Sequence, residues 1–169
     1  WVHPPALCRH LAQHPNIRVL AGEEVRLQRE ADGWSAWSGD AKLASVPVAI
    51  LATAAEVRRF EGASSLPMKR IRGQITRVPA TAESAALSTV VCAEGYVAPP
   101  RHGEHTLGAS FEFKRDDTEP SLEEHLGNLD LLAEISTDLS ERMHIAQLDP
   151  ATLQGRAAFR CTTPDYLPL

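Results

Sequence analysis

The sequence predicts an α+β protein, and three observations carry that prediction. Residues 46–51 are continuously apolar, which is typical of a strand covered on both faces in a parallel sheet. From residue 69 onward, short segments that alternate apolar and polar residues are joined by short turns, which indicates a mostly antiparallel sheet. Ser121 and Glu124 have the spacing of a capping box and predict a helix beyond that sheet.

The change of pattern divides the chain into two predicted domains. Residues 60–67 contain Gly62, Ser64 and Ser65 and read as a linker. We therefore expect a partial α/β domain over residues 1–60. Residues 61–169 should form a second domain with a mostly antiparallel sheet and flanking helices.

Composition limits the possible functions. The 169 residues are 43% hydrophobic and 23% charged, with a formal net charge of -5. An ordinary globular domain has this balance. A dedicated nucleic-acid-binding surface needs clustered Lys and Arg, and the composition of this chain does not favour one. Another part of a longer protein could supply such a surface.

The three cysteines are Cys8, Cys92 and Cys161, and no CxxC pair occurs. Neither a disulfide framework nor a zinc ribbon is predicted, and a reducing cytoplasm fits best. No apolar run is long enough to cross a membrane, and no signal peptide opens the chain.

The first helix is expected after His3-Pro4-Pro5, since proline suits a first helical turn. Leu7 and Leu11 would form its apolar face. Cys8, His10 and His14 could in principle share a metal. Imidazoles in a last turn also suit the negative end of a helix, and this simpler reading predicts no metal.

A hairpin is predicted next, with a strand over residues 24–29 and a turn at Asp32-Gly33. Trp34 and Trp37 follow, and we expect both rings on one face, packed against a sheet. The apolar run then ends in Ala52-Thr53-Ala54-Ala55, where small side chains would let a ligand approach the edge of an open sheet.

Several elements are predicted in the second domain. A strand over residues 69–78 carries a central Gly73, which suggests a bulge or the close approach of another group. Its basic residues read as a solvated face. Further strands cover residues 89–92, 95–98 and 106–113, and a weaker helix covers 136–145. The helix that follows Ser121 should bury Leu122, Leu126 and Leu129.

Arg160 is the most suggestive single side chain. It ends a strand and precedes the turn Thr162-Thr163-Pro164-Asp165, where binding groups are commonly mounted. Its planar guanidinium matches a carboxylate through two parallel hydrogen bonds. The chain then stops at Leu169 without a cap or closing strand, so we expect a piece of a longer protein.

These motifs occur together in a recognisable order. They are a His-Pro-Pro helix, a Val-bearing hairpin, Ala-Thr, Arg72-Gly73-Gln74, a Gly-Tyr-Val-Ala-Pro run, Leu-Gly-Ala-Ser-Phe, and Phe-Arg-x-Thr-x-Pro-Asp. The order resembles the D-amino-acid oxidase superfamily of FAD-dependent amine oxidoreductases. More narrowly, residues 70–76 and 155–169 look like the FAD-dependent half of the bifunctional tRNA 5-methylaminomethyl-2-thiouridine biosynthesis proteins.

The resemblance implies a domain arrangement and a cofactor. Residues 1–60 would be the later part of an FAD-binding domain that lacks the GxGxxG segment, and residues 61–169 the substrate domain. Val25, Thr53, Ala54, Gly73 and Gln74 would contact FAD. The family usually has glycine where this chain has Ala54, and alanine does not freely adopt positive φ.

The resemblance also implies a reaction. FAD would oxidise the carboxymethylaminomethyl group on a tRNA wobble uridine, releasing glyoxylate and leaving aminomethyl uridine. Arg160 would be the catalytic and substrate-binding group that holds the carboxylate, with Tyr96 as a second contact. The partners would be tRNA and a fused methyltransferase domain that uses S-adenosylmethionine.

Alternatives remain open at this stage. Arg160 could instead form an inter-domain salt bridge, and Tyr96 could belong to the core. The protein could be an FAD amine oxidase for free glycine-like amino acids. It could also be a non-catalytic module that binds a carboxylate or phosphate.

Overall fold

The structure is a computed structural model that describes residues 2–166; Trp1 and the predicted chain end at residues 167–169 lie outside the described part. The chain divides into two units, Trp1–Pro67 and Met68–Leu169. The division falls at the end of the segment predicted as a linker. The mixture of helices with antiparallel strands confirms the predicted α+β class.

The first unit begins with helix α1 (Pro4–Ala12), where the two prolines occupy the first turn as predicted. The Nδ1 atom of His3 accepts a hydrogen bond from the backbone of Ala6 at 3.3 Å and caps the helix. Leu7 and Leu11 are 41% and 65% exposed, so the apolar face of α1 is not buried in this structure.

Three antiparallel strands follow in the order β1 (Arg26–Glu30), β2 (Gly33–Ser38) and β3 (Ala41–Val46). The predicted hairpin is therefore present. The prediction that Trp34 and Trp37 share a face is wrong, because residues three apart in a strand point to opposite faces. The indole of Trp37 donates to Ser35 at 2.9 Å, whereas Trp34 stacks with the guanidinium of Arg29.

The predicted parallel strand over residues 46–51 is also wrong. Strand β3 ends at Val46, and residues 47–53 have no regular structure. Val48 and Ile50 are 69% and 88% exposed. A fully apolar strand needs hydrogen-bonding neighbours on both edges and cover on both faces, and no strand of the described chain pairs with these residues. A short 3₁₀ helix, η1 (Ala54–Arg59), follows.

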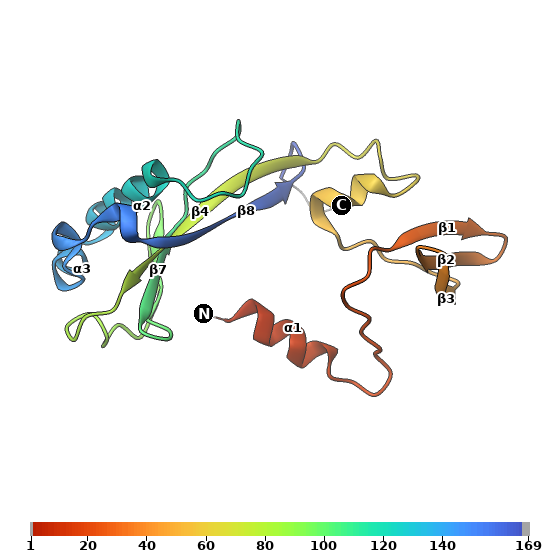
Figure 1. Ribbon diagram of the computed structural model, residues 1–169, viewed down its shortest axis with the longest axis horizontal. Helices are drawn as coiled ribbons and strands as arrows, with labels where there is room; N and C mark the ends of the chain where they lie inside the picture. The colour runs from red at the N-terminus through yellow and green to blue at the C-terminus, as the bar shows by residue number, and fades with distance from the viewer. Residues whose placement is uncertain (1, 167–169) are drawn as a thin grey trace. The chain divides into compact units, whose positions relative to one another are not determined.

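The second unit is built on a five-stranded antiparallel sheet in the order β5-β6-β7-β4-β8. Figure 1 shows its two long strands, β4 (Lys69–Pro79) and β8 (Gln154–Thr162), lying side by side. The shorter strands are β5 (Val91–Cys92), β6 (Tyr96–Val97) and β7 (Glu104–Gly108). The predicted antiparallel sheet is thus confirmed.

Helices α2 (Leu122–Ile135) and α3 (Thr137–Arg142) pack beside this sheet, followed by the 3₁₀ turns η2 (Ile145–Gln147) and η3 (Pro150–Thr152). Helix α2 buries His125, Asn128, Leu129 and Leu132. Leu122 and Leu126 are exposed, which contradicts their predicted burial.

Strand β4 explains why the buried side of α2 differs from the predicted one. Its Thr76 hydroxyl lies 2.9 Å from Nδ1 of His125 and 3.0 Å from Nδ2 of Asn128. Asn128 also donates to the backbone carbonyl of Gln74 at 3.0 Å. A buried polar strand residue must be paired, so polar helix residues occupy positions that leucines were expected to fill.

The hydrophobic core lies next to this polar contact. Its buried members are Val78, Val97, Leu107, Leu129, Leu132 and Met143. They come from strands β4, β6 and β7, from α2 and from Met143 just after α3, so this core joins the sheet to its helical layer.

The register of the sheet separates two faces. On β4, Arg72, Gln74 and Thr76 point toward α2, where they meet Glu124, Ser121 and His125. Alternation sends Ile71, Gly73 and Ile75 to the opposite face. Their partners on β8 are Arg160, Ala158 and Arg156. We call this opposite surface the open face, because α2 covers the other one.

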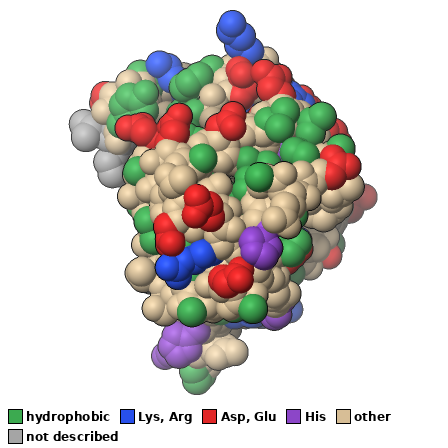
Figure 2. Space-filling view, turned by 90° about the vertical axis from the view of Figure 1, so that its left-hand side faces the viewer, with side chains coloured by type: hydrophobic (Ala, Val, Ile, Leu, Met, Phe, Trp, Pro, Cys, Tyr) green, Lys and Arg blue, Asp and Glu red, His purple; other side chains and the backbone are tan. Residues whose placement is uncertain are grey.

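The surface near α3 carries mixed side chains. Figure 2 shows acidic and hydrophobic groups intermixed on it, with few Lys or Arg side chains. Helix α2 itself contains four acidic residues and no Lys or Arg. A polyanion would be repelled from such a face. Within residues 2–166, no helix has the length and apolar character needed to cross a bilayer.

Truncating Leu132 should destabilise the second unit strongly. Leu132 is 1% exposed in the core, and Leu132→Ala should lower the free energy of unfolding by about 2–5 kcal/mol. Leu126→Ala is the matched control on the same helix, and because this leucine is 45% exposed its effect should stay below about 1 kcal/mol. Urea denaturation measures both; equal losses would contradict the observed orientation of α2.

Candidate functional site

Arg160 lines a pocket of about 230 Å³ on the second unit. Arg160 lies on β8 opposite Ile71, and Gly73 pairs with Ala158 beside them. The segment from Ala109 to Phe111 forms another part of the lining. Small residues at Gly73 and Ala158 leave the sheet backbone accessible between the arginine and this segment.

The guanidinium of Arg160 is exposed, and within residues 2–166 no acid forms an ion pair with it and no acceptor bonds it. An unpaired guanidinium beside a concavity can bind a carboxylate or phosphate in a bidentate manner. The structure therefore places Arg160 in a position compatible with its predicted role.

Gly73 has a structural reason to be glycine. A Cβ atom at this position would lie 2.9 Å from the backbone carbonyl oxygen of Ser110. The predicted close approach of another group to Gly73 is confirmed, and the group is the protein's own backbone. Any ligand in the pocket would meet Gly73 through its remaining exposed side.

Gln74 does not lie with Gly73 on the open face. Its side chain is fully buried on the α2 face. The amide donates to the carbonyl of Ser121 at 3.0 Å and accepts from the backbone N–H of Ser121 at 2.7 Å. The Gln74 side chain therefore has its hydrogen bonds satisfied internally and is not available to a cofactor.

Tyr96 lies on the open face, but it is on β6 and does not line the pocket of Arg160. It pairs with Gly108 on β7, and a Cβ on Gly108 would stand 3.5 Å from the Tyr96 hydroxyl. Burial raises the pKa of Tyr96, against the opposing effect of the Arg156 charge. Tyr96 therefore keeps its hydroxyl proton at neutral pH, and the arginine whose charge acts on it is Arg156.

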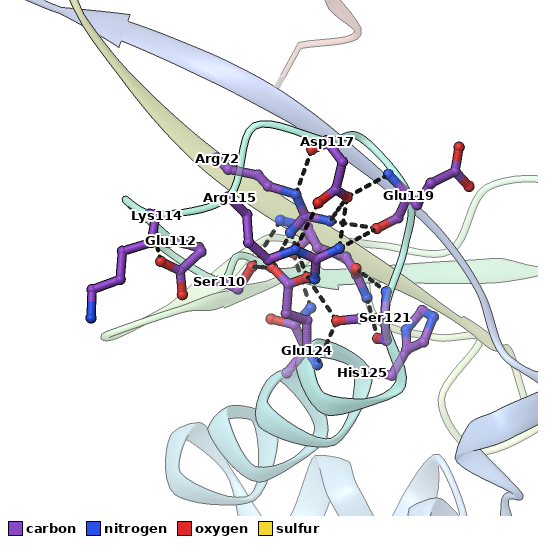
Figure 3. Close-up of polar contacts among 12 residues, drawn as sticks. Arg72, Ser110, Glu112, Lys114, Arg115, Asp117, Glu119, Ser121, Glu124 and His125 are labelled. Atoms are coloured by element: carbon purple, nitrogen blue, oxygen red, sulfur yellow. Dashed lines mark hydrogen bonds and ion pairs between the residues drawn. The ribbon is translucent and has the colours of Figure 1, made fainter.

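Behind the pocket, on the α2 face, lies a buried polar cluster that sequence reasoning missed (Figure 3). Arg72 is fully buried and forms an ion pair with Glu124 of α2. Its Nε atom donates to the carbonyl of Asp117 at 2.7 Å, and its Nη2 atom donates to the carbonyl of Glu119. Arg115 also reaches Glu124, at 3.2 Å.

Glu124 is held ionised by its neighbours. Desolvation alone would raise the pKa of Glu124, but hydrogen bonds from Ser110, Arg72 and Ser121 outweigh it, and the pKa lies below its usual range. Ser121 caps α2 as predicted, and its hydroxyl donates to Glu124 at 2.8 Å. The Glu124 carboxylate thus serves the ion pair with Arg72 rather than closing the capping box.

Ser110 connects this cluster to the Arg160 pocket. Its hydroxyl accepts from the backbone N–H of Gln74 at 2.9 Å and donates to Glu124 at 2.6 Å. Its backbone carbonyl is the group that faces Gly73. The sequence did hold a signal for this cluster, because alternate residues of a strand point to the same face. Arg72 therefore lies on the same face of β4 as Gln74, Thr76 and the core residue Val78.

A separate cavity of about 940 Å³ belongs to the first unit. Val25 and Thr53 both line it, so the structure brings these two predicted cofactor contacts together. Acidic residues surround them at Glu23, Glu24, Glu56 and Glu61, together with Arg26 and Arg59. Arg59 forms ion pairs with Glu24 and Glu56.

Ala54 follows Thr53 and adopts a φ of 50°. This is the left-handed region, which glycine adopts freely and alanine does not. The backbone conformation that glycine would favour is therefore kept here in spite of the alanine. Ala54 itself does not line the cavity.

No three His, Cys, Asp or Glu side chains within residues 2–166 lie so that they could hold a metal ion. The cysteines Cys8, Cys92 and Cys161 are free thiols.

Comparisons with known proteins add family information to this geometry. The model of the DAO family, described as "FAD dependent oxidoreductase", matches residues 1–169. The chain is 64% identical over its whole length to the "tRNA 5-methylaminomethyl-2-thiouridine biosynthesis bifunctional protein MnmC" of Pseudomonas putida F1, and 64% identical to that of Pseudomonas aeruginosa PAO1. It spans 26% of the length of each of these relatives.

Two solved structures share the fold. Glycine oxidase from Geobacillus kaustophilus gives a TM-score of 0.65 at 19% identity, over 86% of this chain and 38% of that one. Glycine oxidase from Bacillus cereus ATCC 14579 gives a TM-score of 0.63 at 14% identity, over 86% of this chain and 39% of that one.

Replacing Ala54 with glycine should stabilise the chain. Ala54→Gly removes backbone strain of about 1–2 kcal/mol, offset in part by the greater entropy of glycine in the unfolded state. A net gain of roughly 0.5–1 kcal/mol in the free energy of unfolding is expected. Ala55→Gly lies outside the left-handed region and should instead destabilise; urea denaturation showing the same sign for both variants would contradict this assignment.

The Arg72–Glu124 pair should give the fold a dependence on acid pH. A lowered folded-state pKa contributes stability above the ordinary value of 4.5, and that stability is lost as the pH falls through the folded-state pKa. Glu124→Gln should cost about 3 kcal/mol at pH 7, because it removes the nearer counter-charge of the buried Arg72 and leaves only the Asp117 carboxylate, at 3.6 Å. The difference from wild type should shrink below pH 4.5. Denaturation at several pH values measures this; a constant difference would show that charge plays no part.

Proposed function

We propose a function for this chain on the basis of its family. The chain belongs to the FAD dependent oxidoreductase family. The chain forms part of an enzyme that oxidises the carboxymethylaminomethyl group on a tRNA wobble uridine, releases glyoxylate and leaves aminomethyl uridine. The observation that carries this proposal is the unpaired, exposed guanidinium of Arg160 beside a small pocket. The identity of 62–65% to bifunctional MnmC proteins supports the choice of substrate.

The substrate group is a glycine attached through its nitrogen to the base. Oxidation removes a hydride from the carbon between nitrogen and carboxylate, the nitrogen lone pair forms the C=N bond, and water then hydrolyses that bond. The neutral amine drives hydride departure, so no strong protein base is required. The task of the protein is orientation, and Arg160 performs it by binding the carboxylate that adjoins the reacting carbon.

FAD is the cofactor of this family and, when bound, supplies the hydride acceptor. Val25 and Thr53 would hold its adenosine part. The four glutamates around them fit this role, because carboxylates accept hydrogen bonds from ribose hydroxyl and adenine amino groups. The same charges would repel a pyrophosphate, whose binding is therefore assigned to residues elsewhere.

The assignment of domains follows from these roles. Residues 1–60 form part of an FAD-binding domain, and residues 61–169 form the substrate domain that carries Arg160 and Tyr96. Gly73 would face the flavin ring across the pocket through its backbone. tRNA and a fused methyltransferase domain that uses S-adenosylmethionine are the proposed partners, in the cytoplasm.

A second candidate is an oxidase for free glycine-like amino acids. The exposed guanidinium of Arg160 beside the pocket favours it equally, because a free amino acid carries the same carboxylate. The two candidates are separated by assaying the purified full-length bifunctional protein with an anticodon stem-loop that carries the modified uridine and with glycine. Oxidation of glycine alone would select the second candidate.

Removing the Arg160 guanidinium should weaken substrate binding without loss of FAD. Arg160→Ala should raise KM by about 30- to 100-fold, since a hydrogen bond to a charged group contributes about 1.5–3 kcal/mol. Steady-state kinetics with the modified stem-loop and the flavin absorbance of the purified protein measure the two effects. Arg77→Ala is the control, because it removes a guanidinium that is already paired with Glu104. Unchanged kinetics in Arg160→Ala would remove this residue from its role.

A further inference from the structure

Phe111 brings an exposed aromatic ring to the pocket of Arg160. Both residues line the same cavity of about 230 Å³, with Gly73 and Ala158 between them. The Phe111 side chain is 57% exposed. Exposed aromatic area is unfavourable in water, so an aromatic ring beside a cationic group in a concavity is a feature that ligand binding would explain.

The backbone on either side of Phe111 is fixed to β4. Ser110 donates its N–H to the carbonyl of Gln74 at 3.1 Å. Glu112 exchanges two backbone hydrogen bonds with Arg72, each 2.9 Å long. Phe111 therefore projects from a segment held on both sides rather than from a free loop, which gives the ring a defined position relative to Arg160.

Phe113 provides a contrast two residues further on. It is 68% exposed, like Phe111, but it does not line the pocket. The segment thus presents two similar rings, of which one faces the candidate site. This difference allows the role of the pocket to be separated from a general effect of an exposed aromatic residue.

We propose that Phe111 stacks on the pyrimidine ring of the wobble uridine whose substituent is bound by Arg160. This inference rests on the proposed function and deepens it by naming a residue that selects a nucleotide-linked substrate. Proteins that bind unpaired bases commonly stack them on Phe, Tyr or Trp. A substrate with a carboxylate at one end and a planar base at the other matches a pocket with a guanidinium and an aromatic ring.

The test compares Phe111→Ala, Phe111→Trp and Phe113→Ala in the full-length bifunctional protein. The substrate is an anticodon stem-loop RNA that carries carboxymethylaminomethyl uridine at the wobble position. Phe111→Ala should raise KM about tenfold or more, as expected from the effect of removing a stacking side chain. Phe111→Trp should restore a KM close to that of wild type, and Phe113→Ala should behave as wild type. The FAD content should be equal in all variants.

The outcomes separate the possible failures. If wild-type protein does not oxidise the stem-loop, the proposed function fails. If wild type is active and Phe111→Ala has the kinetics of Phe113→Ala, only the stacking role is overturned. Loss of FAD from Phe111→Ala, or failure of Trp to rescue it, would assign the ring to the cofactor or to folding and would also overturn the proposal.

Discussion

The buried ion pair between Arg72 and Glu124 is the constraint on which the second unit depends. Arg72 is fully enclosed, and a guanidinium cannot lose its charge to escape the cost of desolvation. Every donor it presents must therefore find an acceptor, and the acceptors are Glu124 and the carbonyls of Asp117 and Glu119. These partners bring together the central strand, the irregular segment after β7 and the start of α2. Such a pair adds little net stability compared with apolar packing, but removing one partner is strongly destabilising.

The same cluster shapes the open face through Ser110. The Ser110 hydroxyl is bonded to Gln74 and Glu124, and this places its carbonyl against Gly73. Phe111 then follows from a fixed backbone, on the side of the sheet that carries Arg160. The side chains of β4 that face α2 are thus held by internal hydrogen bonds, while the open face of the sheet carries Gly73 of β4 and Ala158 of β8 beside the exposed Arg160. The polar contacts that hold α2 and the lining of the Arg160 pocket therefore lie on opposite faces of the same sheet.

The sequence predicted local features well and pairing partners poorly. Capping by Ser121 and the hairpin before Trp34 depend on short-range rules, and the structure confirms both, with the turn at Ala31-Asp32 rather than Asp32-Gly33. The burial of Arg72 and Gln74 depends on segments more than 40 residues away, so the alternation along β4 could indicate their shared face but not the partners that bury them. Leu122 and Leu126 are exposed for the same reason, because Thr76 places polar residues of α2 in the interface, whereas Leu129 is buried as predicted. Residues 47–53 form no strand because a buried strand is defined by neighbours, and none pairs with them within residues 2–166.

Ala54 adopts a backbone conformation that suits glycine better than alanine. Its positive φ costs about 1–2 kcal/mol for an alanine. A relaxed backbone would redirect the chain between Thr53, which lines the larger cavity, and Phe60, which also lines it. The following turn also carries Arg59, whose ion pairs with Glu24 and Glu56 hold η1 against the segment before β1. The strained residue thus lies in a segment that contributes Thr53 and Phe60 to the lining of the larger cavity, which Val25 also lines. The path of the chain at position 54 is therefore set by its surroundings rather than by the conformational preference of the residue.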